Sequence, residues 1–93
     1  IIIQNAINKN VNVKIRYNSK QEILNKEIPP VKIVKFIDKN LFYLISIENG
    51  ELAYYRINRI IDIKLTKTKS IVSDEDLKLL DIFDYGYHIC NRH

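Results

Sequence analysis

The chain begins with a helical pattern that gives way to a strand pattern. Ile3, Ala6 and Ile7 recur at the spacing of one helical face, which predicts a short helix over about residues 1–9. Over residues 11–17, apolar residues alternate strictly with polar ones. This period of two predicts a strand with one face toward a core and the other toward solvent.

Further strands follow, separated by turn residues. An extended stretch over about residues 25–37 is interrupted by Pro29-Pro30, which cannot donate to a neighbouring strand and therefore mark an edge or a bend. Asn49-Gly50 predicts a type I′ hairpin, because both residue types accept a positive φ. The hairpin joins residues 41–48 to residues 51–57.

A last alternating strand over residues 61–66 makes five short strands after one helix. A small bent antiparallel sheet of this kind hides its edges by closing on itself. The expected fold is therefore mainly β, a five-stranded antiparallel barrel over residues 1–70. Residues 71–93 are expected to form a helical extension and tail, in which Ser73 caps a short helix with an acidic first turn.

Length and composition narrow the class of protein. A chain of 93 residues holds one small domain, and 46% hydrophobic residues is typical of a globular one. No run approaches the roughly 18 apolar residues of a membrane span. The start at Ile1 has no methionine and does not read as a signal peptide but as a helix cut mid-way, so we expect a fragment whose missing part lies on the N-terminal side. The single Cys90 cannot form an internal disulfide, which favours a cytoplasmic protein.

Charge is distributed unevenly along the chain. Residues 1–70 carry 13 Lys and Arg against 6 Asp and Glu, whereas residues 71–93 carry 2 against 5. A basic domain attracts phosphate-bearing partners over about a Debye length. Nucleotides and nucleic acid are therefore possible ligands, although lysine-rich proteins are often basic without binding anything.

Several blocks of residues, in order, resemble a known family. The triplet Phe42-Tyr43-Leu44 is followed by Ser46, and the next strand reads Tyr55-Arg56-Ile57-Asn58-Arg59-Ile60. Upstream stand the first helix and strand, and then Lys26-Glu27-Ile28-Pro29-Pro30. Over about residues 3–68 this series resembles a WYL domain, with Phe42 in place of the name-giving tryptophan and Asn58 in place of the usual acid.

The resemblance implies both a fold and a role. It implies an SH3-like or Sm-like barrel, in agreement with the strand pattern. WYL domains commonly follow a winged-helix or helix-turn-helix DNA-binding domain in bacterial transcriptional regulators, where they sense ligands. The missing N-terminal part would then be the DNA-binding domain.

Arg56 and Arg59 are the first candidate binding residues. Two guanidiniums at the end of one strand present forked donors to a phosphate or carboxylate, and the resemblance implies that they line the family's ligand groove. The alternative is a pair of surface arginines bridging to Glu48, Glu51 or Asp62.

Three more residues complete the predicted site. Tyr43 and Tyr17 each offer a flat ring for a base and a hydroxyl for a phosphate, although strand aromatics are more often packing residues. Lys26 stands where the family commonly has an arginine, and it is carried over as a groove residue. Phe42 is assigned to packing.

Other chemistry has little support in the sequence. His88, Cys90 and His93 could bind zinc, but no Cys-x-x-Cys pair or fourth ligand accompanies them, so no metal is expected. No nucleophile with a paired base and no glycine-rich phosphate loop is found among so few glycines. We therefore expect a non-enzyme without a cofactor.

The sequence thus predicts a ligand-sensing domain of a bacterial transcriptional regulator. It would bind a nucleotide or single-stranded nucleic acid and shift the orientation of attached DNA-binding domains in a dimer. The rival hypothesis is a protein-interaction or dimerisation module with no small ligand. Direct reading of duplex DNA is less favoured, because no helix has a basic face that fits a major groove.

Overall fold

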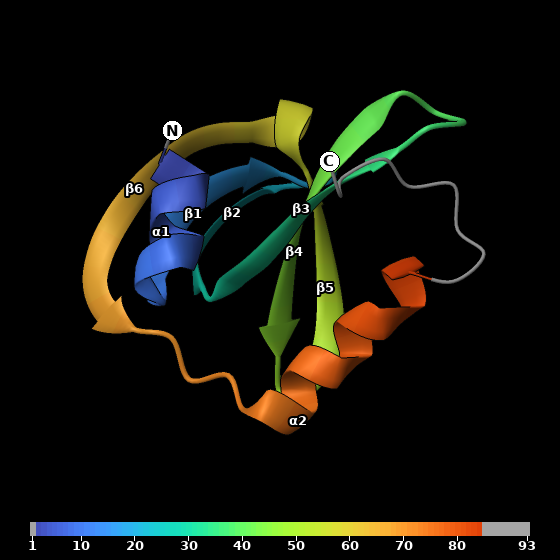
Figure 1. Cartoon of the computed structure of the whole chain (residues 1–93). Coiled ribbons are helices and arrows are strands. Elements are labelled where there is room, and N and C mark those ends of the chain that lie inside the picture. The colour runs from blue at the N-terminus through green and yellow to red at the C-terminus, as the bar shows by residue number, and fades with distance from the viewer. Residues whose placement is uncertain (1, 85–93) are drawn as a thin grey trace.

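The computed structural model of the chain describes residues 2–84, which are drawn in colour in Figure 1. The elements in order are α1 (Ile2–Lys9), β1 (Val11–Asn18), β2 (Ile23–Ile28), β3 (Pro30–Phe36), β4 (Leu41–Glu48), β5 (Glu51–Arg56), the 3₁₀ helix η1 (Ile57–Arg59), β6 (Ile60–Lys69), α2 (Asp74–Leu77) and the 3₁₀ helix η2 (Lys78–Asp84).

The strands form two three-stranded antiparallel sheets. β1 lies between β2 and β6 in the first sheet, and β4 lies between β3 and β5 in the second. The mainly β fold with a helix at each end is confirmed. The closed five-stranded barrel is wrong, because the stretch predicted over residues 25–37 contributes one strand to each sheet.

The two prolines explain this division. β2 ends at Ile28 and β3 begins at Pro30. A single strand through Pro29 and Pro30 would lack two consecutive N–H donors, so its ladder would be interrupted. The chain instead leaves the first sheet at Ile28, which pairs with Val13, and enters the second, where Pro30 pairs with Ser46.

The main core lies between the two sheets and α1. The alternation predicted for β1 is confirmed, since Val11, Val13, Ile15 and Tyr17 are buried. The predicted helical face is confirmed too, with Ile3 and Ala6 buried and Ile7 packed against the cluster. The buried residues of this core are Ile3, Ala6, Val11, Val13, Ile15, Tyr17, Ile28, Leu44 and Tyr55.

A second cluster lies on the opposite face of the sheet β3-β4-β5, which we call the outer face. Val34 and Ile45 of that sheet pack there with Phe83 of η2. Figure 1 shows the C-terminal helical segment running past β4 and β5. Its start after Ser73 is confirmed, because the Ser73 Oγ accepts the Asp76 N–H at 3.0 Å and the Asp76 carboxylate accepts the Ser73 N–H at 3.3 Å.

The predicted hairpin between β4 and β5 is also confirmed. Asn49 and Gly50 have φ values of 54° and 78°, as a type I′ turn requires. Glu48 therefore lies opposite Glu51, and Tyr43 lies opposite Arg56 at the far end of the pair. This register decides which side chains of the predicted site share a face.

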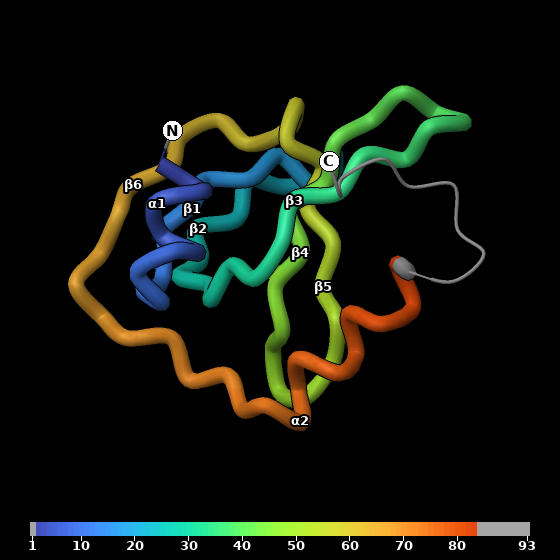
Figure 2. The backbone as a smooth tube through the Cα atoms, viewed as in Figure 1, coloured from blue at the N-terminus to red at the C-terminus, as the bar shows by residue number. Residues whose placement is uncertain are grey.

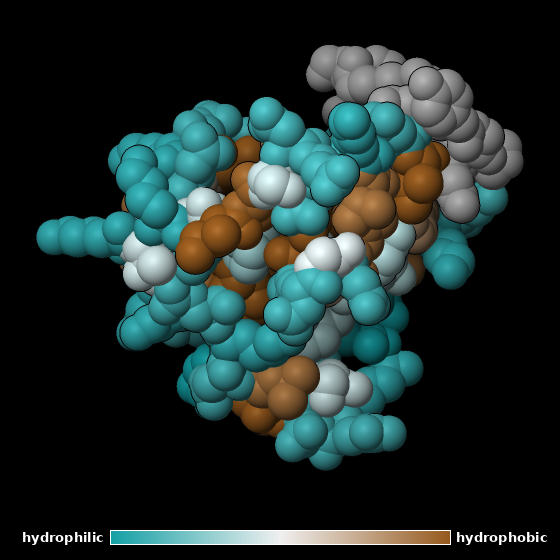
Figure 3. Space-filling model, turned by 90° about the horizontal axis from the view of Figure 1, so that it is seen from below, coloured by the Kyte–Doolittle hydropathy of each residue, from teal (hydrophilic) through white to brown (hydrophobic). Residues whose placement is uncertain are grey.

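Apolar side chains reach the surface in several places. Figure 3 shows brown patches among mostly hydrophilic residues on one side of the molecule. Exposed large side chains include Phe42, Tyr54, Ile61, Leu65 and Ile71. Within residues 2–84, no helix is long and apolar enough to cross a membrane.

Candidate functional site

Arg56 and Tyr43 lie next to each other on the outer face. They are directly opposite in neighbouring strands, and opposite residues in an antiparallel pair project to the same side. Tyr54, two residues before Arg56, shares that side. The Nε atom of Arg56 is buried and has no hydrogen-bond partner. A guanidinium is always charged and the Arg56 side chain is partly exposed, so it remains able to bind an anion.

Arg59 lies near Arg56 in sequence but not in the same strand. β5 ends at Arg56, and Arg59 is the last residue of the 3₁₀ helix η1. The expectation that both arginines end one strand is therefore wrong. Within residues 2–83, no carboxylate lies within ion-pair distance of either arginine, and the ion pair found there joins Lys26 to Glu48. The alternative of arginines bridged to neighbouring acids is therefore not what the structure contains.

Tyr43 sits among other aromatic rings. Its ring centroid is 4.9 Å from that of Phe36 and 6.3 Å from that of Tyr54, and Tyr54 lies 6.1 Å from Phe83. Distances of this size are typical of favourable aromatic contacts. The side chain is half-buried, and it packs against the outer cluster that includes Phe83.

Tyr17 lies on the other side of the sheet, in the main core. It is 8% exposed, and its ring meets that of Tyr55 edge to face at 5.2 Å. Its hydroxyl accepts the backbone N–H of Arg56 at 3.0 Å. Tyr17 thus has little surface for stacking a base, but it fixes the end of β5 from which Arg56 projects.

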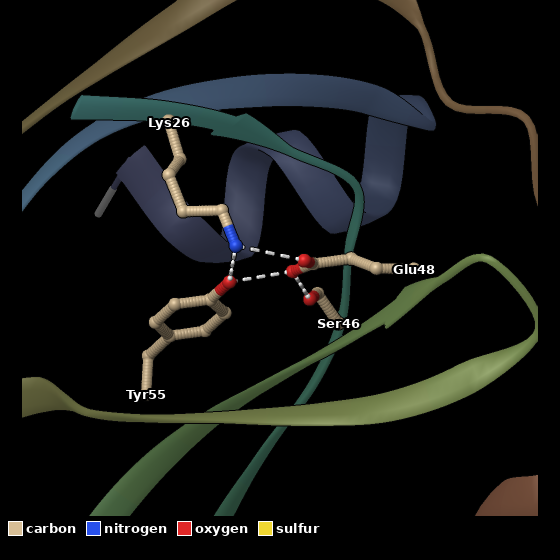
Figure 4. A network of polar contacts seen from close by, with 4 residues as sticks. All are labelled: Lys26, Ser46, Glu48 and Tyr55. Carbon is tan, nitrogen blue, oxygen red and sulfur yellow. Dashed lines mark hydrogen bonds and ion pairs between the residues drawn. The ribbon is translucent and has the colours of Figure 1, made fainter. Parts of the chain in front are cut away.

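Lys26 also belongs to the inner side, where it enters a polar network that Figure 4 shows. Its Nζ donates to Glu48 Oε1 at 3.0 Å and to the Tyr55 hydroxyl at 2.8 Å. The Tyr55 hydroxyl donates to Glu48 Oε2 at 2.6 Å, and the Ser46 hydroxyl donates to the same oxygen. The network therefore ties β2 of the first sheet to β4 and β5 of the second.

The network shifts the pKa values of its members. A hydrogen bond to Tyr55 is the main reason that the pKa of Lys26 is raised, against burial and with help from Glu48. Burial pushes the pKa of Glu48 upward, but hydrogen bonds from Ser46, Tyr55 and Lys26 outweigh it and lower the pKa. Burial and the bond to Glu48 raise the pKa of Tyr55. At neutral pH, Glu48 is thus a carboxylate that accepts from an ammonium and two hydroxyls.

The five predicted residues therefore do not form one groove. Arg56 and Tyr43 share the outer face, Arg59 follows them in η1, and Lys26 and Tyr17 lie on the inner side. Their binding of a ligand remains a prediction.

Sequence reasoning missed Glu48, Ser46 and Tyr55 as a set. Strand alternation and the hairpin register could have placed Ser46 and Glu48 of β4 on the same face as Tyr55 of β5, but they could not have shown that Lys26 reaches them from another sheet.

Two pockets lie close to these residues. A shallow pocket of about 360 Å³ covers the first sheet and includes Lys14, Arg16, Lys26 and Lys64. A smaller one of about 170 Å³ lies between the start of β4 and η1, and its lining includes Phe42 and Asn58. Phe42 is half-exposed there, with the Lys35 Nζ 5.6 Å from its ring centroid. The prediction that Phe42 is a packing residue is therefore only partly confirmed.

Residues 2–84 contain no cluster of three His, Cys, Asp or Glu side chains that could hold a metal ion. The cluster that the sequence suggested, His88, Cys90 and His93, lies outside the described residues.

Comparison with known proteins finds a similar fold but no matching family. No protein-family model matches the chain, and no curated protein matches it. Among solved structures, the chain is similar to part of the proteasome accessory factor B/C (PafBC) of Arthrobacter aurescens, with a TM-score of 0.64 and 17% identity. The similarity covers 73% of this chain and 11% of the PafBC chain. The same fold thus occurs as a small part of a much longer protein.

Proposed function

We propose that this chain is a regulatory domain that senses a negatively charged ligand, a nucleotide or a short single-stranded nucleic acid. The ligand would place a phosphate against Arg56 and Arg59 and a base against the ring of Tyr43. The proposal joins the resemblance to WYL domains with the arrangement of these side chains at one end of β5. By that resemblance, the domain would regulate transcription together with an attached DNA-binding domain.

One observation carries the proposal: the guanidinium of Arg56 has a buried Nε without a hydrogen-bond partner. A buried polar group left unsatisfied costs about 1–3 kcal/mol, so proteins rarely retain one without a reason. An anionic oxygen bound to the partly exposed guanidinium would recover that cost if the side chain rotated to open Nε to it. No carboxylate within residues 2–83 pairs with Arg56 or Arg59, which leaves both charges available to a ligand.

The residues behind the site would hold it in place. Tyr17 binds the backbone of Arg56, and the network of Lys26, Glu48, Ser46 and Tyr55 fixes the preceding residue of β5. In this proposal Tyr17 and Lys26 position the site and do not touch the ligand. Rigid supporting contacts reduce the entropy lost on binding, so these residues would raise the affinity for the ligand without touching the ligand.

The test is fluorescence anisotropy with labelled single-stranded oligonucleotides and cyclic dinucleotides at two salt concentrations. Two phosphate contacts to single-stranded nucleic acid predict about a sevenfold loss of affinity between roughly 50 and 200 mM salt. Arg59→Glu should abolish binding, whereas Lys69→Glu, at the far end of β6, makes the same charge change and should have little effect. Absence of binding to every probe, or equal loss in the two variants, would contradict the proposed site.

A further inference from the structure

β6 is an edge strand with one side unpaired. It hydrogen-bonds to β1, and within residues 2–84 no strand lies on its other side. Figure 2 shows β6 as the long yellow-to-orange segment that follows the margin of the molecule. An edge of 10 residues exposes a row of backbone donors and acceptors, which is a template for another strand.

Large apolar side chains are exposed along this edge. Ile61 is 53% exposed and Leu65 is 41% exposed. Leu65 ends the stretch from Asp62 to Leu65, which pairs regularly with β1 from Arg16 to Val13, and Ile61 precedes it at a register shift. The stretch is therefore an extended strand with apolar groups at both of its ends, and burial against a partner would stabilise it by removing that area from water.

The charges of the same stretch are arranged around its centre. Asp62 and Lys64 stand on either side of Ile63, on the face that β1 shares through Arg16 and Lys14. Lys64 lies directly opposite Lys14, an unfavourable cross-strand contact between like charges. Neither Asp62 nor Lys64 forms an ion pair within residues 2–83. Lys64 would therefore gain from an acidic neighbour on its open side.

We propose that β6 pairs with β6 of a second copy of this chain, antiparallel, with the two-fold axis passing between the two Ile63 residues. In this register Asp62 of each copy lies opposite Lys64 of the other. Ile61 of each copy lies opposite Leu65 of the other. One strand thus supplies both complementary charge pairs and both apolar pairs, because a two-fold interface uses the same patch twice.

Neighbouring registers do not have this property. In an antiparallel two-fold pair, residues that lie opposite each other must have side chains on the same face. The register can therefore shift only by two residues at a time. A shift by two residues in one direction places Asp62 opposite Asp62 of the other copy. A shift in the other direction places Lys64 opposite Lys64 of the other copy. Like charges directly opposite are destabilising. The pairing ends at Ile60, because the residues before it, Ile57–Arg59, form η1, and extension would bring Arg59 against Lys67.

A pair of short strands is a small interface, so the dimer is a weak one whose population depends on protein concentration. Sedimentation velocity over a concentration series, with the 93-residue chain, measures this directly. The wild-type sedimentation coefficient should rise with concentration toward the value of a dimer. A chain that remains monomeric throughout the series would overturn the proposal.

Two charge reversals test the register itself. Asp62→Lys leaves two lysines facing two lysines, and Lys64→Asp leaves two aspartates facing two aspartates, so each variant alone should self-associate about tenfold more weakly or worse. An equimolar mixture should dimerise again, because each lysine then faces an aspartate. Lys69→Asp makes the same charge change beyond the pairing and should leave dimerisation unchanged. A mixture that stays monomeric, or single variants that dimerise like the wild type, would overturn the proposed register.

Discussion

Replacing Glu48 by alanine removes the common acceptor of the polar network in Figure 4. Glu48 accepts from the Ser46 and Tyr55 hydroxyls and from the Lys26 ammonium. In the Glu48→Ala variant all three donors lose that partner at once. The variant should therefore be less stable than the loss of one surface ion pair would make it.

The size of the effect follows from burial. Ser46 is fully buried, so its hydroxyl left without an acceptor costs about 1–3 kcal/mol. Tyr55 is 5% exposed, and its hydroxyl adds about 1 kcal/mol. Lys26 adds little, because its side chain is 38% exposed and keeps its bond to Tyr55, so water replaces the carboxylate. We expect a loss of about 2–4 kcal/mol, out of the roughly 5–14 kcal/mol typical of a domain of this size.

Urea unfolding followed by circular dichroism measures this loss as a change in the midpoint at constant m-value. In thermal unfolding it corresponds to a fall of about 10 °C or more. Glu51→Ala is the matched control, because Glu51 lies opposite Glu48 in the same hairpin but is exposed. The control should change stability by less than about 0.5 kcal/mol. Equal losses in the two variants would refute the argument that the network, rather than hairpin charge, holds the sheets together.

Three other predictions rest on neighbouring contacts. Because the pKa of Glu48 is lowered in the folded chain, its contribution is complete above the ordinary value of 4.5 and is lost as pH falls through the lowered pKa; acid unfolding monitored by circular dichroism should therefore be shallower in Glu48→Ala than in the wild type. Tyr17→Phe removes the acceptor of the Arg56 N–H and should cost about 1–2 kcal/mol in urea unfolding; an unchanged midpoint would show that this bond does not stabilise the end of β5. Phe83→Ala should cost about 3 kcal/mol and raise binding of a hydrophobic dye, because the outer cluster loses its cover; an unchanged midpoint would show that η2 does not contribute to the fold.

Local patterns were sufficient to predict most elements. Strand alternation located β1, and Asn49-Gly50 fixed the register that places Tyr43 opposite Arg56. The prediction of a closed barrel is wrong at Pro29. There the sequence shows that the hydrogen-bond ladder is interrupted, but not which sheet receives the next strand. That choice depends on packing between distant segments, which a local pattern does not contain.

The placement of the candidate binding residues was predictable only as far as they follow strand periodicity. Tyr43 and Arg56 were expected on strands, and their shared face follows from the hairpin. Lys26 was expected in a groove because of its position in a motif, yet it reaches Glu48 and Tyr55 across the two sheets. An ammonium beside a carboxylate is satisfied within the fold, whereas the Nε of Arg56 is not.

Lys26 and Arg56 are both cations, but they have different roles. Lys26 has a carboxylate and a hydroxyl within hydrogen-bond distance, so an anionic ligand would have to compete with Glu48 for it. Arg56 has no such competitor within residues 2–84, and Tyr17 already holds its backbone. Binding of an anion at Arg56 would therefore add an interaction without breaking one. Removing Glu48 should weaken the fold, but it should not by itself create or abolish a site at Arg56. Stability and ligand affinity should thus vary independently across variants of these two positions.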